Sequence, residues 1–511
     1  MLGKNERKIK VNSARSFLMA NVSVLALSAC GSNSSSEVPT ETTDLLKSNL
    51  ISGTDDADSI PGTLGDDVVK ALGGNDFVLT LAGDDEIYGG DGDDTVWADE
   101  GNDIIYGGAG NDTLYPGGGD DLTYGGDGDD IIYLSSGNDK EDGGAGNDTL
   151  KIASNHSGIA TTIDLLVGQY YFTAQGSSAF FNLSSIENID SQADADLTIK
   201  DTPEVNLITT GSGNDNITSV GGDDIISTGS GNDFVELATG FTYNVKLGAG
   251  NDEVVLGLTY SQIDGGTGVD TLTVKGQSDF YADLASGFYF FEGVATSQDG
   301  FDTLLSNFEK ITVTGQISAE LIGGSGGETF KTDGGADTIS GAGGNDVISV
   351  GEDADTVTGG AGADTIDLGL EDLAADTVIF SAASVNGSDT ITSFETGIDT
   401  LNVGATGTLV GTITIDTSSA AAKVALSAAQ ILIVTDNTAA DWSDVAAKMT
   451  AGLDLTGDVT GSSVIVVDNG TDSRVYFYED NAAAADIVDA ELTLLATLTN
   501  TVLAEGDFVV A

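Results

Sequence analysis

Aspartate recurs every nine residues over a long stretch of this chain. Eleven aspartates follow one another at this spacing without a slip, from Asp58 to Asp148. From Gly65 onward a glycine stands two residues before each aspartate, and an apolar side chain stands two residues after most of them, with Thr123 and Glu141 as exceptions. An unbroken period of nine predicts a solenoid, in which each repeat packs against its neighbours.

Each nine-residue unit combines a tight turn with a short strand. Glycine supplies the positive φ that the turn needs, and the three residues after the aspartate alternate out, in, out as a strand. Two units make one coil, so carboxylates eighteen residues apart would stack roughly 5 Å from each other. Like charges at that distance repel, so folding must be coupled to the binding of a cation. Carboxylate and carbonyl oxygens suit Ca²⁺ better than zinc or copper.

The unit reads G-G-x-G-x-D-x-U-x, where U is apolar, and it resembles the repeat-in-toxin (RTX) calcium-binding nonapeptide. Ten consecutive copies keep the same phase up to residue 150. The resemblance implies a parallel β-roll whose repeats fold when calcium binds between the coils. The predicted fold class is therefore all-β dominated, a parallel β-roll or β-solenoid, followed by a small α+β C-terminal domain.

The nine-residue phase stops and restarts twice, which divides the chain into segments. Glu187 and Glu309 lie 122 residues apart, the same offset as Gly143 and Gly265, so the two stretches between the repeat blocks are related inserts. The predicted segments are a signal peptide (1–29), a polar tether (30–50), RTX block 1 (51–150), a β-rich insert (151–204), RTX block 2 (205–275), a related β-rich insert (276–322), RTX block 3 (323–368), a roll-closing segment (369–405) and an α+β domain (406–511).

The predicted calcium ligands are in-phase aspartates of the three blocks. Acidic pairs eighteen residues apart set an upper limit of fourteen sites between coils. The predicted ligands are Asp76, Asp85, Asp94, Asp103, Asp112, Asp121, Asp130, Asp139, Asp148, Asp215, Asp233, Asp252, Asp270, Asp337, Asp346, Asp355 and Asp364.

The two edges of the predicted roll differ in block 1. The aspartates of one edge follow a full Gly-Gly pair, at Gly89-Gly90, Gly107-Gly108, Gly125-Gly126 and Gly143-Gly144. The corresponding pairs of the other edge are Thr80-Leu81, Ala98-Asp99, Pro116-Gly117 and Leu134-Ser135. We therefore expect the first edge to bind calcium more regularly and more tightly than the second.

Aromatic residues form a second period of nine, just after the inward apolar position: Tyr88, Trp97, Tyr106, Tyr115, Tyr124 and Tyr133. Alternation along the strands points them outward, as a column of three on each sheet. One interpretation is a flat aromatic platform for polysaccharide. The other is that stacked aromatic side chains stabilise adjacent strands.

The N-terminus predicts export. Five basic residues precede an apolar stretch that ends at Cys30, which is typical of a signal peptide and too short to span a membrane. The "LSAC" at 27–30 resembles a bacterial lipobox, which implies a lipidated Cys30; the alternative is an ordinary signal with an incidental cysteine. With a single cysteine, an intramolecular disulfide and a cysteine-based zinc site are excluded.

The region after residue 376 loses the nine-residue phase. "DTVIFSAASVNGSDTITSFETGIDTLNV" (376–403) resembles the segment that closes many RTX rolls. We expect a strand in "ILIVTD" (431–436), a helix in "AADWSDVAAKM" (439–449) and a hairpin about Asn469-Gly470. The final "LAEGDFVVA" resembles the end of type I secretion substrates, which conflicts with the lipobox because such substrates usually lack a cleaved signal.

The charge balance limits the partners. With 82 acidic against 17 basic residues, the net charge is −65, which excludes attraction to nucleic acid and to anionic lipid surfaces. Catalysis is not expected: His156 is the only histidine, and the repeats begin some twenty residues after Cys30. The leading prediction is a calcium-binding extracellular or cell-surface structural or adhesive protein. The alternative is a polysaccharide-binding or polysaccharide-active protein that uses the aromatic ladder.

Overall fold

A computed structural model describes the chain at residues 49–154, 160–172, 181–276, 278–292, 304–369, 374–380, 388–393 and 399–403, together with five strands between 412 and 499. The chain divides into two units, Met1–Lys47 and Ser48–Ala511, and every described residue belongs to the second. Several predicted features lie outside the described residues: the signal peptide, Cys30, His156, the helix at 439–449 and the final "LAEGDFVVA".

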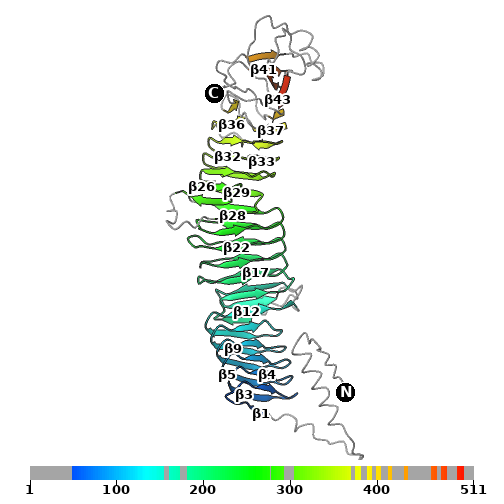
Figure 1. The fold of residues 1–511 in the computed structure, drawn as a ribbon, viewed down its shortest axis with the longest axis vertical. Helices are drawn as coiled ribbons and strands as arrows, with labels where there is room; N and C mark the ends of the chain where they lie inside the picture. Colours follow the sequence, from blue (N-terminus) through cyan, green and yellow to red (C-terminus); the bar gives the residue numbers. More distant parts are fainter. Residues whose placement is uncertain are drawn as a thin grey trace, which may run out of the picture. The chain divides into compact units, whose positions relative to one another are not determined.

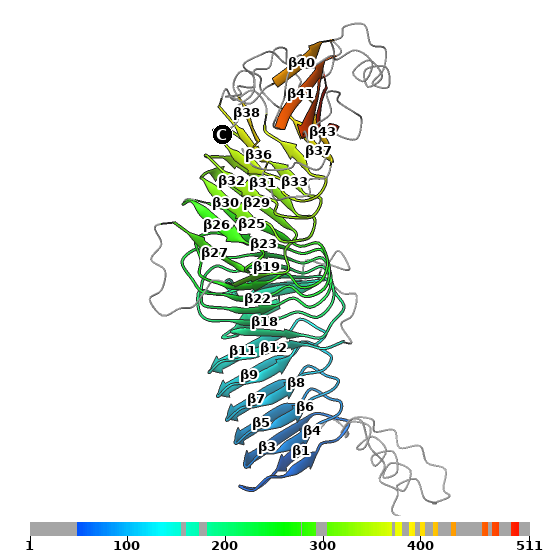
Figure 2. The same ribbon diagram turned by 45° about the horizontal axis from the view of Figure 1, so that its top comes forward.

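The described residues form β-strands in two sheets that face each other (Figures 1 and 2). The first sheet contains β1 (Asn49–Ser52), β3 (Asp67–Gly73), β5 (Glu86–Asp91), β7 (Ile104–Ala109), β9 (Leu122–Asp127), β11 (Lys140–Ala145), β13 (Thr161–Asp164), β14 (Gln169–Phe172), β15 (Phe181–Ser184), β17 (Leu197–Lys200), β19 (Asn216–Thr218), β21 (Phe234–Glu236), β23 (Glu253–Leu256), β25 (Thr271–Lys275), β29 (Lys310–Gln316), β31 (Thr329–Gly334), β33 (Val347–Ser349), β35 (Thr365–Asp367), β37 (Ser388–Thr392), β39 (Thr412–Asp416), β40 (Ile431–Thr435), β41 (Ser462–Asp468), β42 (Ser473–Glu479) and β43 (Leu492–Thr499).

The second sheet contains β2 (Ser59–Pro61), β4 (Phe77–Leu79), β6 (Thr95–Trp97), β8 (Thr113–Tyr115), β10 (Ile131–Tyr133), β12 (Thr149–Ile152), β16 (Asn188–Ser191), β18 (Leu207–Thr209), β20 (Ile225–Ser227), β22 (Asn244–Lys246), β24 (Gln262–Asp264), β26 (Phe280–Asp283), β27 (Phe288–Phe291), β28 (Leu304–Ser306), β30 (Ala319–Ile322), β32 (Thr338–Ser340), β34 (Thr356–Thr358), β36 (Thr377–Phe380) and β38 (Thr400–Val403). No helix within the described residues is long and apolar enough to cross a membrane.

Strands that pair within one sheet come from successive coils. In the first sheet Glu86 of β5 pairs with Ile104 of β7, and in the second Thr95 of β6 pairs with Thr113 of β8, both in parallel register. Each coil of block 1 therefore has eighteen residues and contributes one strand to each sheet. The parallel β-solenoid predicted from the nine-residue period is confirmed.

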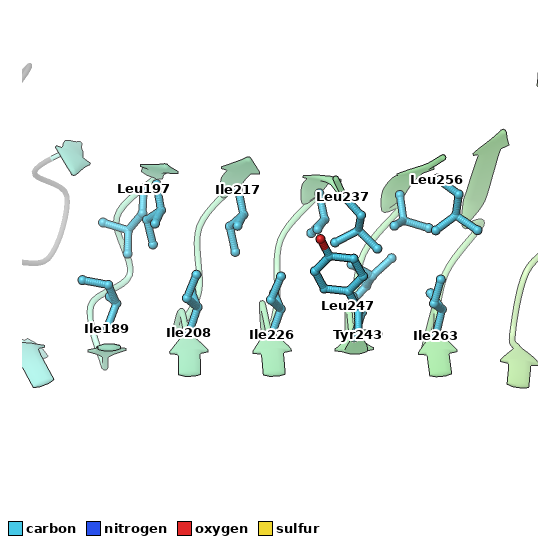
Figure 3. Close-up of a cluster of buried hydrophobic side chains, with 14 of the residues drawn as sticks. Ile189, Leu197, Ile208, Ile217, Ile226, Leu237, Tyr243, Leu247, Leu256 and Ile263 are labelled. Carbon is cyan, nitrogen blue, oxygen red and sulfur yellow. The ribbon is translucent and has the colours of Figure 1, made fainter. Parts of the chain in front are cut away.

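The core is a double row of aliphatic side chains between the sheets. Residues two positions after the in-phase acids, such as Ile105 of β7 and Leu114 of β8, are fully buried. Figure 3 shows the same arrangement further along the solenoid, where Ile208 and Ile226 of the second sheet face Ile217 of the first. Burying one such side chain stabilises the fold by roughly 1.5–3 kcal/mol.

Glu141 is the exception in this core. It stands at an inward position of β11 and is fully buried, and the hydroxyl of Tyr170 in β14 donates a hydrogen bond to its Oε1 (3.1 Å). Burial raises the pKa of Glu141 to about 8, with the nearby Asp139 adding to the rise. The side chain is therefore largely neutral at pH 7, which makes its position in the core tolerable.

The two related inserts extend opposite sheets. In the first, β13 and β14 form an antiparallel hairpin in the first sheet, and β15 pairs with β11 of the last coil of block 1. In the second, β26 and β27 form the equivalent hairpin in the second sheet, and β28 pairs with β24. A fully buried tyrosine, Tyr170 or Tyr289, anchors each hairpin to the core.

Beyond block 3 the strands continue the parallel ladder. β36 pairs with β34 and β37 pairs with β35, so the predicted closing segment adds further coils. β39 pairs in parallel with both β37 and β43. The predicted strand at 431–436 is present as β40, and the predicted hairpin about Asn469-Gly470 is present as the antiparallel pair β41 and β42.

The turns predict how glycine substitutions act. Gly108 has φ of +127°, and a Cβ there would collide with the carbonyl oxygen of Gly90 in the preceding coil. At Gly118 the nearest atoms to an added Cβ are side-chain oxygens at 3.4 and 3.5 Å. Gly108→Ala should therefore destabilise the protein by at least about 1–2 kcal/mol, and Gly118→Ala should have little effect. Urea unfolding in excess calcium measures the difference; equal midpoints for the two variants would contradict this account of the turns.

Candidate metal centre

The in-phase acids form hydrogen-bonded columns on both edges of the solenoid. We call the turns that lead from the first sheet into the second the first edge, and the opposite turns the second edge. On the first edge the backbone N–H of Asp94 donates to Oδ1 of Asp112 (2.8 Å), and on the second Asp103 donates to Asp121 in the same way (2.8 Å). Eighteen-residue stacking thus places each carboxylate against the coil before it, as the sequence predicts.

The second carboxylate oxygen of these residues is buried and has no hydrogen-bond partner among the described residues. In Asp112, for example, the side chain is 1 % exposed and Oδ2 is unpaired. An uncompensated buried carboxylate costs several kcal/mol of folding free energy. The predicted ligands in this state are Asp76, Asp85, Asp94, Asp103, Asp112, Asp121, Asp130, Asp148, Asp215, Asp233, Asp252, Asp270, Asp337, Asp346 and Asp364.

Two predicted ligands differ in detail. Oδ2 of Asp139 accepts a hydrogen bond from Oγ of Ser135 (2.8 Å). Asp355 lies in the column of the first edge, where its Oδ1 accepts the N–H of Asp337 (2.8 Å). All seventeen predicted ligands therefore stand in the two columns, and a hydroxyl already satisfies Oδ2 of Asp139.

A small space faces these unpaired oxygens on the first edge of block 1. We call the residue five positions before each in-phase acid the cradle residue. A Cβ added to Gly89 would lie 2.5 Å from Oδ2 of Asp94 and close to the carbonyl oxygen of Gly107. One added to Gly107 would lie 2.5 Å from the Gly125 carbonyl oxygen and close to Oδ2 of Asp112. These are Ca²⁺–oxygen distances, about 2.3–2.6 Å, so glycine at the cradle position leaves room for a cation.

The donor set fits calcium. Each cradle joins a carboxylate of one coil to a main-chain carbonyl of the next, and both are hard oxygen ligands. Within the described residues, no three Asp, Glu, His or Cys side chains come together as a metal-binding group. A cation held here therefore depends on main-chain oxygens as well as carboxylates, which Ca²⁺ accepts readily and zinc does not.

A family model for the RTX calcium-binding nonapeptide repeat matches seven segments of the chain, some of which overlap: 52–87, 79–114, 88–123, 115–150, 203–237, 322–357 and 341–372. The chain carries RTX calcium-binding repeats. The matched segments lie within the three repeat blocks, apart from short extensions at their ends. A search of curated proteins finds no match to the chain.

On the second edge of RTX block 1 the cradle residue is glycine at Gly62 and carries a side chain from Thr80 onward. A Cβ added to Gly62 there would lie 2.8 Å from Oδ2 of Asp67 and 2.9 Å from the Thr80 carbonyl oxygen, so a side chain at this position fills the cradle. At Thr80 it does so with a hydroxyl, which donates to the carbonyl oxygen of Ala98 (3.1 Å). The remaining cradle residues of this edge are Ala98, Pro116 and Leu134. The predicted inequality of the two edges therefore has a structural basis.

The columns of the RTX repeats continue where the nine-residue spacing does not. Across the inserts, Oε2 of Glu187 accepts the N–H of Asp148, and Oε2 of Glu309 accepts the N–H of Asp270, both at 2.8 Å. Asp376, Asp389 and Asp399 extend the columns beyond block 3. The ligand prediction missed these five acids because their spacing is irregular. The equal offset of Glu187 and Glu309 was the available signal for two of them.

A second, exposed ladder borders the columns. In block 1, from Asn75 on the first edge and from Asp84 on the second, the residue before each in-phase acid alternates between Asn and Asp on successive coils. Its side-chain oxygen accepts the backbone N–H of the next coil, as from Asn111 to Asp93 (2.9 Å). On the second edge the Asn138 amide also donates to Asp120 (2.8 Å). Alternation separates the charges of this outer ladder by two coils, which reduces their repulsion.

Burial raises the pKa values of the column carboxylates. The rise is to about 7 for Asp103, Asp112 and Asp121, with burial as the largest cause and the adjacent carboxylates as a further one. The backbone N–H that each Oδ1 accepts opposes the rise. Without a cation, the folded column therefore holds protons that an unfolded chain would release at the same pH.

This proton binding predicts a pH effect on the metal-free protein. A carboxyl whose pKa is higher in the folded state than in the unfolded chain binds its proton more tightly in the folded state. It stabilises the fold fully at pH values below its ordinary pKa near 4, and this contribution is lost as the pH rises through its folded-state pKa of about 6–7. In excess chelator, acidification from about pH 8 to pH 5 should therefore increase β-structure measured by circular dichroism. In saturating calcium the same change should have a much smaller effect. A chelated protein that loses β-structure on acidification would contradict the assignment.

The unequal edges predict unequal effects of neutral substitutions. Asp112→Asn keeps the Oδ1 acceptor and removes a carboxylate that faces an open glycine cradle, so the calcium midpoint of folding should rise several-fold. Asp121→Asn is the matched control on the second edge, where Pro116 occupies the cradle, and its midpoint should stay near that of the wild type. Both positions lie in the middle of block 1. Calcium titrations followed by circular dichroism compare them, and equal shifts would show that the edges are equivalent.

Proposed function

We propose that this protein is a calcium-binding structural or adhesive protein of the bacterial cell surface or extracellular space, whose RTX repeats fold when calcium is present. The observation that carries the proposal is the pair of columns of buried carboxylates with unpaired Oδ2 atoms. Such columns are unfavourable in a folded chain until a cation neutralises them. Calcium then acts as a structural component of the coils.

The site chemistry supports a location outside the cytoplasm. A site made of one or two carboxylates and main-chain carbonyls resembles those extracellular modules that bind calcium at about 0.1–1 mM. Calcium at that level is available outside the cell, where the repeats would fold after export. The predicted signal peptide and the lipobox-like "LSAC" agree with this location. Calcium ions are the primary partner, surface polysaccharide or other cell-surface components are further candidates, and membrane contact would be through lipidated Cys30.

The aromatic ladder supports a structural role more than a polysaccharide platform. Trp97 and Tyr115 stack at 3.8 Å between ring centroids, and Tyr115 and Tyr133 at 4.0 Å. In the first sheet Tyr88, Tyr106 and Tyr124 stack at 4.9 and 5.1 Å, and lysine ammonium groups lie near the two end rings. The ring faces are turned to each other, so the ladder offers ring edges to a ligand, whereas sugars stack on faces. We therefore place polysaccharide binding second, and we propose no catalytic role.

The proposed function predicts that calcium, surface location and adhesion change together. The mature protein should lose most of the β-structure of block 1 in chelator and regain it at roughly 0.1–1 mM Ca²⁺. On cells, antibody labelling and attachment to a surface should fall after chelation and recover with calcium but not with magnesium.

Cys30→Ser should release the protein from the membrane fraction without altering its calcium response. A circular dichroism spectrum that chelator leaves unchanged would overturn the calcium-dependent fold, and labelling confined to lysed cells would overturn the location.

A further inference from the structure

The cradle residue divides the described RTX coils into two kinds. Glycine leaves the cradle open on the first edge of block 1 and, from Gly265 onward, on the second edge. For each of these glycines, an added Cβ would meet both the in-phase acid and a carbonyl oxygen of the next coil, or the acid alone at Gly359. The open cradles are at Gly89, Gly107, Gly125, Gly143, Gly265, Gly323, Gly341 and Gly359. Gly53 and Gly62, at the start of block 1, have similar surroundings, but Oδ2 of Asp58 and of Asp67 already accepts a backbone N–H, from Thr54 (2.7 Å) and from Thr63 (2.6 Å).

Block 2 before Gly265 is of the other kind. There, Asp215, Asp233 and Asp252 on the second edge have Thr210, Thr228 and Leu247 as cradle residues. Oγ1 of Thr210 donates to the carbonyl oxygen of Thr228 (2.7 Å), and Oγ1 of Thr228 donates to that of Leu247 (2.6 Å). The hydroxyl thus bonds the carbonyl oxygen that a cation would bind in an open cradle.

The aspartates beside these cradles each keep one bonded oxygen. Oδ1 of Asp215 accepts the backbone N–H of Leu197, and Oδ1 of Asp233 accepts that of Asp215, both at 2.8 Å. Oδ2 of both aspartates is buried and unpaired among the described residues. The cradle in front of each Oδ2 already holds a side chain whose hydroxyl bonds the carbonyl oxygen of the next coil, so it leaves no space for a cation.

The rest of block 2 carries little charge that would need a cation. On its first edge the column positions are occupied by Asn206, Asp224, Tyr243 and Ser261. Asp224 is the acid among these four, and its Oδ2 accepts a hydrogen bond from Oγ of Ser219 (2.9 Å). Nearby Asp201 has its Oδ1 bonded to the N–H of Val220 (2.7 Å), while its Oδ2 is buried and unpaired among the described residues. Burial raises the pKa of Asp201, which favours the neutral acid.

The exposed ladder beside the second edge is uncharged in block 2 as well. Asn214, Asn232 and Asn251 follow one another, where block 1 alternates Asn with Asp. The side-chain oxygen of Asn214 accepts the N–H of Asn232 (2.8 Å), and that of Asn232 accepts the N–H of Asn251 (2.7 Å). Neutral amides make the same inter-coil bonds without repulsion between coils.

We propose that the coils from about residue 205 to 256 fold without calcium and form a metal-independent centre of the solenoid, and that calcium occupies the open glycine cradles on either side of it. The inference rests on the proposed calcium-dependent fold. It removes Asp215, Asp233 and Asp252 from the predicted calcium ligands, although the family model matches 203–237. Because solenoid folding propagates from coil to coil, the centre supplies a folded template for both flanking blocks before calcium arrives.

Hydrogen exchange of the full mature chain, followed by mass spectrometry, tests the inference. In chelator, amides of 207–255 should stay protected, whereas those of 86–150 and 329–367 should exchange quickly; calcium should protect all three regions. Rapid exchange of all three regions in chelator would overturn the metal-independent centre and leave the calcium-dependent fold intact. Protection of all three regions in chelator would overturn both.

Variants of the cradle residue give a second readout, the number of calcium ions bound in equilibrium dialysis. Thr228→Gly opens a cradle between Asp233 and the Leu247 carbonyl, so one additional ion should bind. Thr228→Val is the matched control: it removes the hydroxyl but keeps the cradle filled, so the count should stay at the wild-type value. Gly107→Thr should lower the count by one. An unchanged count for both Thr228→Gly and Gly107→Thr would overturn the role assigned to the cradle residue.

Discussion

Repulsion between stacked carboxylates is the constraint on which this structure depends. An eighteen-residue coil returns the same residue to the same place, so one aspartate in the repeat becomes a column of aspartates in the fold. Burial raises the pKa values of these groups, because the charged form is penalised away from water. The column is compatible with a folded chain when calcium, a proton or a hydrogen-bond donor compensates each unpaired oxygen. RTX blocks 1 and 3 offer open cradles for calcium, whereas threonine hydroxyls in block 2 fill their cradles and bond the carbonyl oxygens there.

The rest of the architecture keeps the columns intact. Backbone N–H groups bond one oxygen of each carboxylate, and the aliphatic core holds the coils at a fixed spacing. Each insert separates successive acids of a column by 39 residues instead of eighteen. There Glu187 or Glu309 takes the place of an aspartate and accepts the backbone N–H of the preceding acid. The longer glutamate side chain allows the backbone to depart from the nonapeptide geometry while the hydrogen bond of the column is kept.

The cradle residue is the part of the repeat that tunes each coil. Glycine, threonine and larger residues at this position differ in whether they leave a space, fill it with a donor, or fill it with an apolar group. The open cradles lie on the first edge of block 1 and, from Gly265 onward, on the second edge. The related inserts likewise lie in opposite sheets, since Asp148 belongs to the first edge and Asp270 to the second.

The sequence by itself determined the solenoid, the coil length, the inward positions and the aspartate columns, because each follows from an unbroken period of nine. It also identified Glu187 and Glu309 as equivalent positions, and it showed that the second edge of block 1 lacks full Gly-Gly pairs. Only the tertiary structure revealed that Oδ1 is bonded while Oδ2 is unpaired, that Tyr170 donates a hydrogen bond to Oε1 of Glu141, and that Thr228 bonds the carbonyl of Leu247. These contacts join residues of different coils and an insert, and a side chain's direction within a turn depends on backbone angles that residue spacing does not specify.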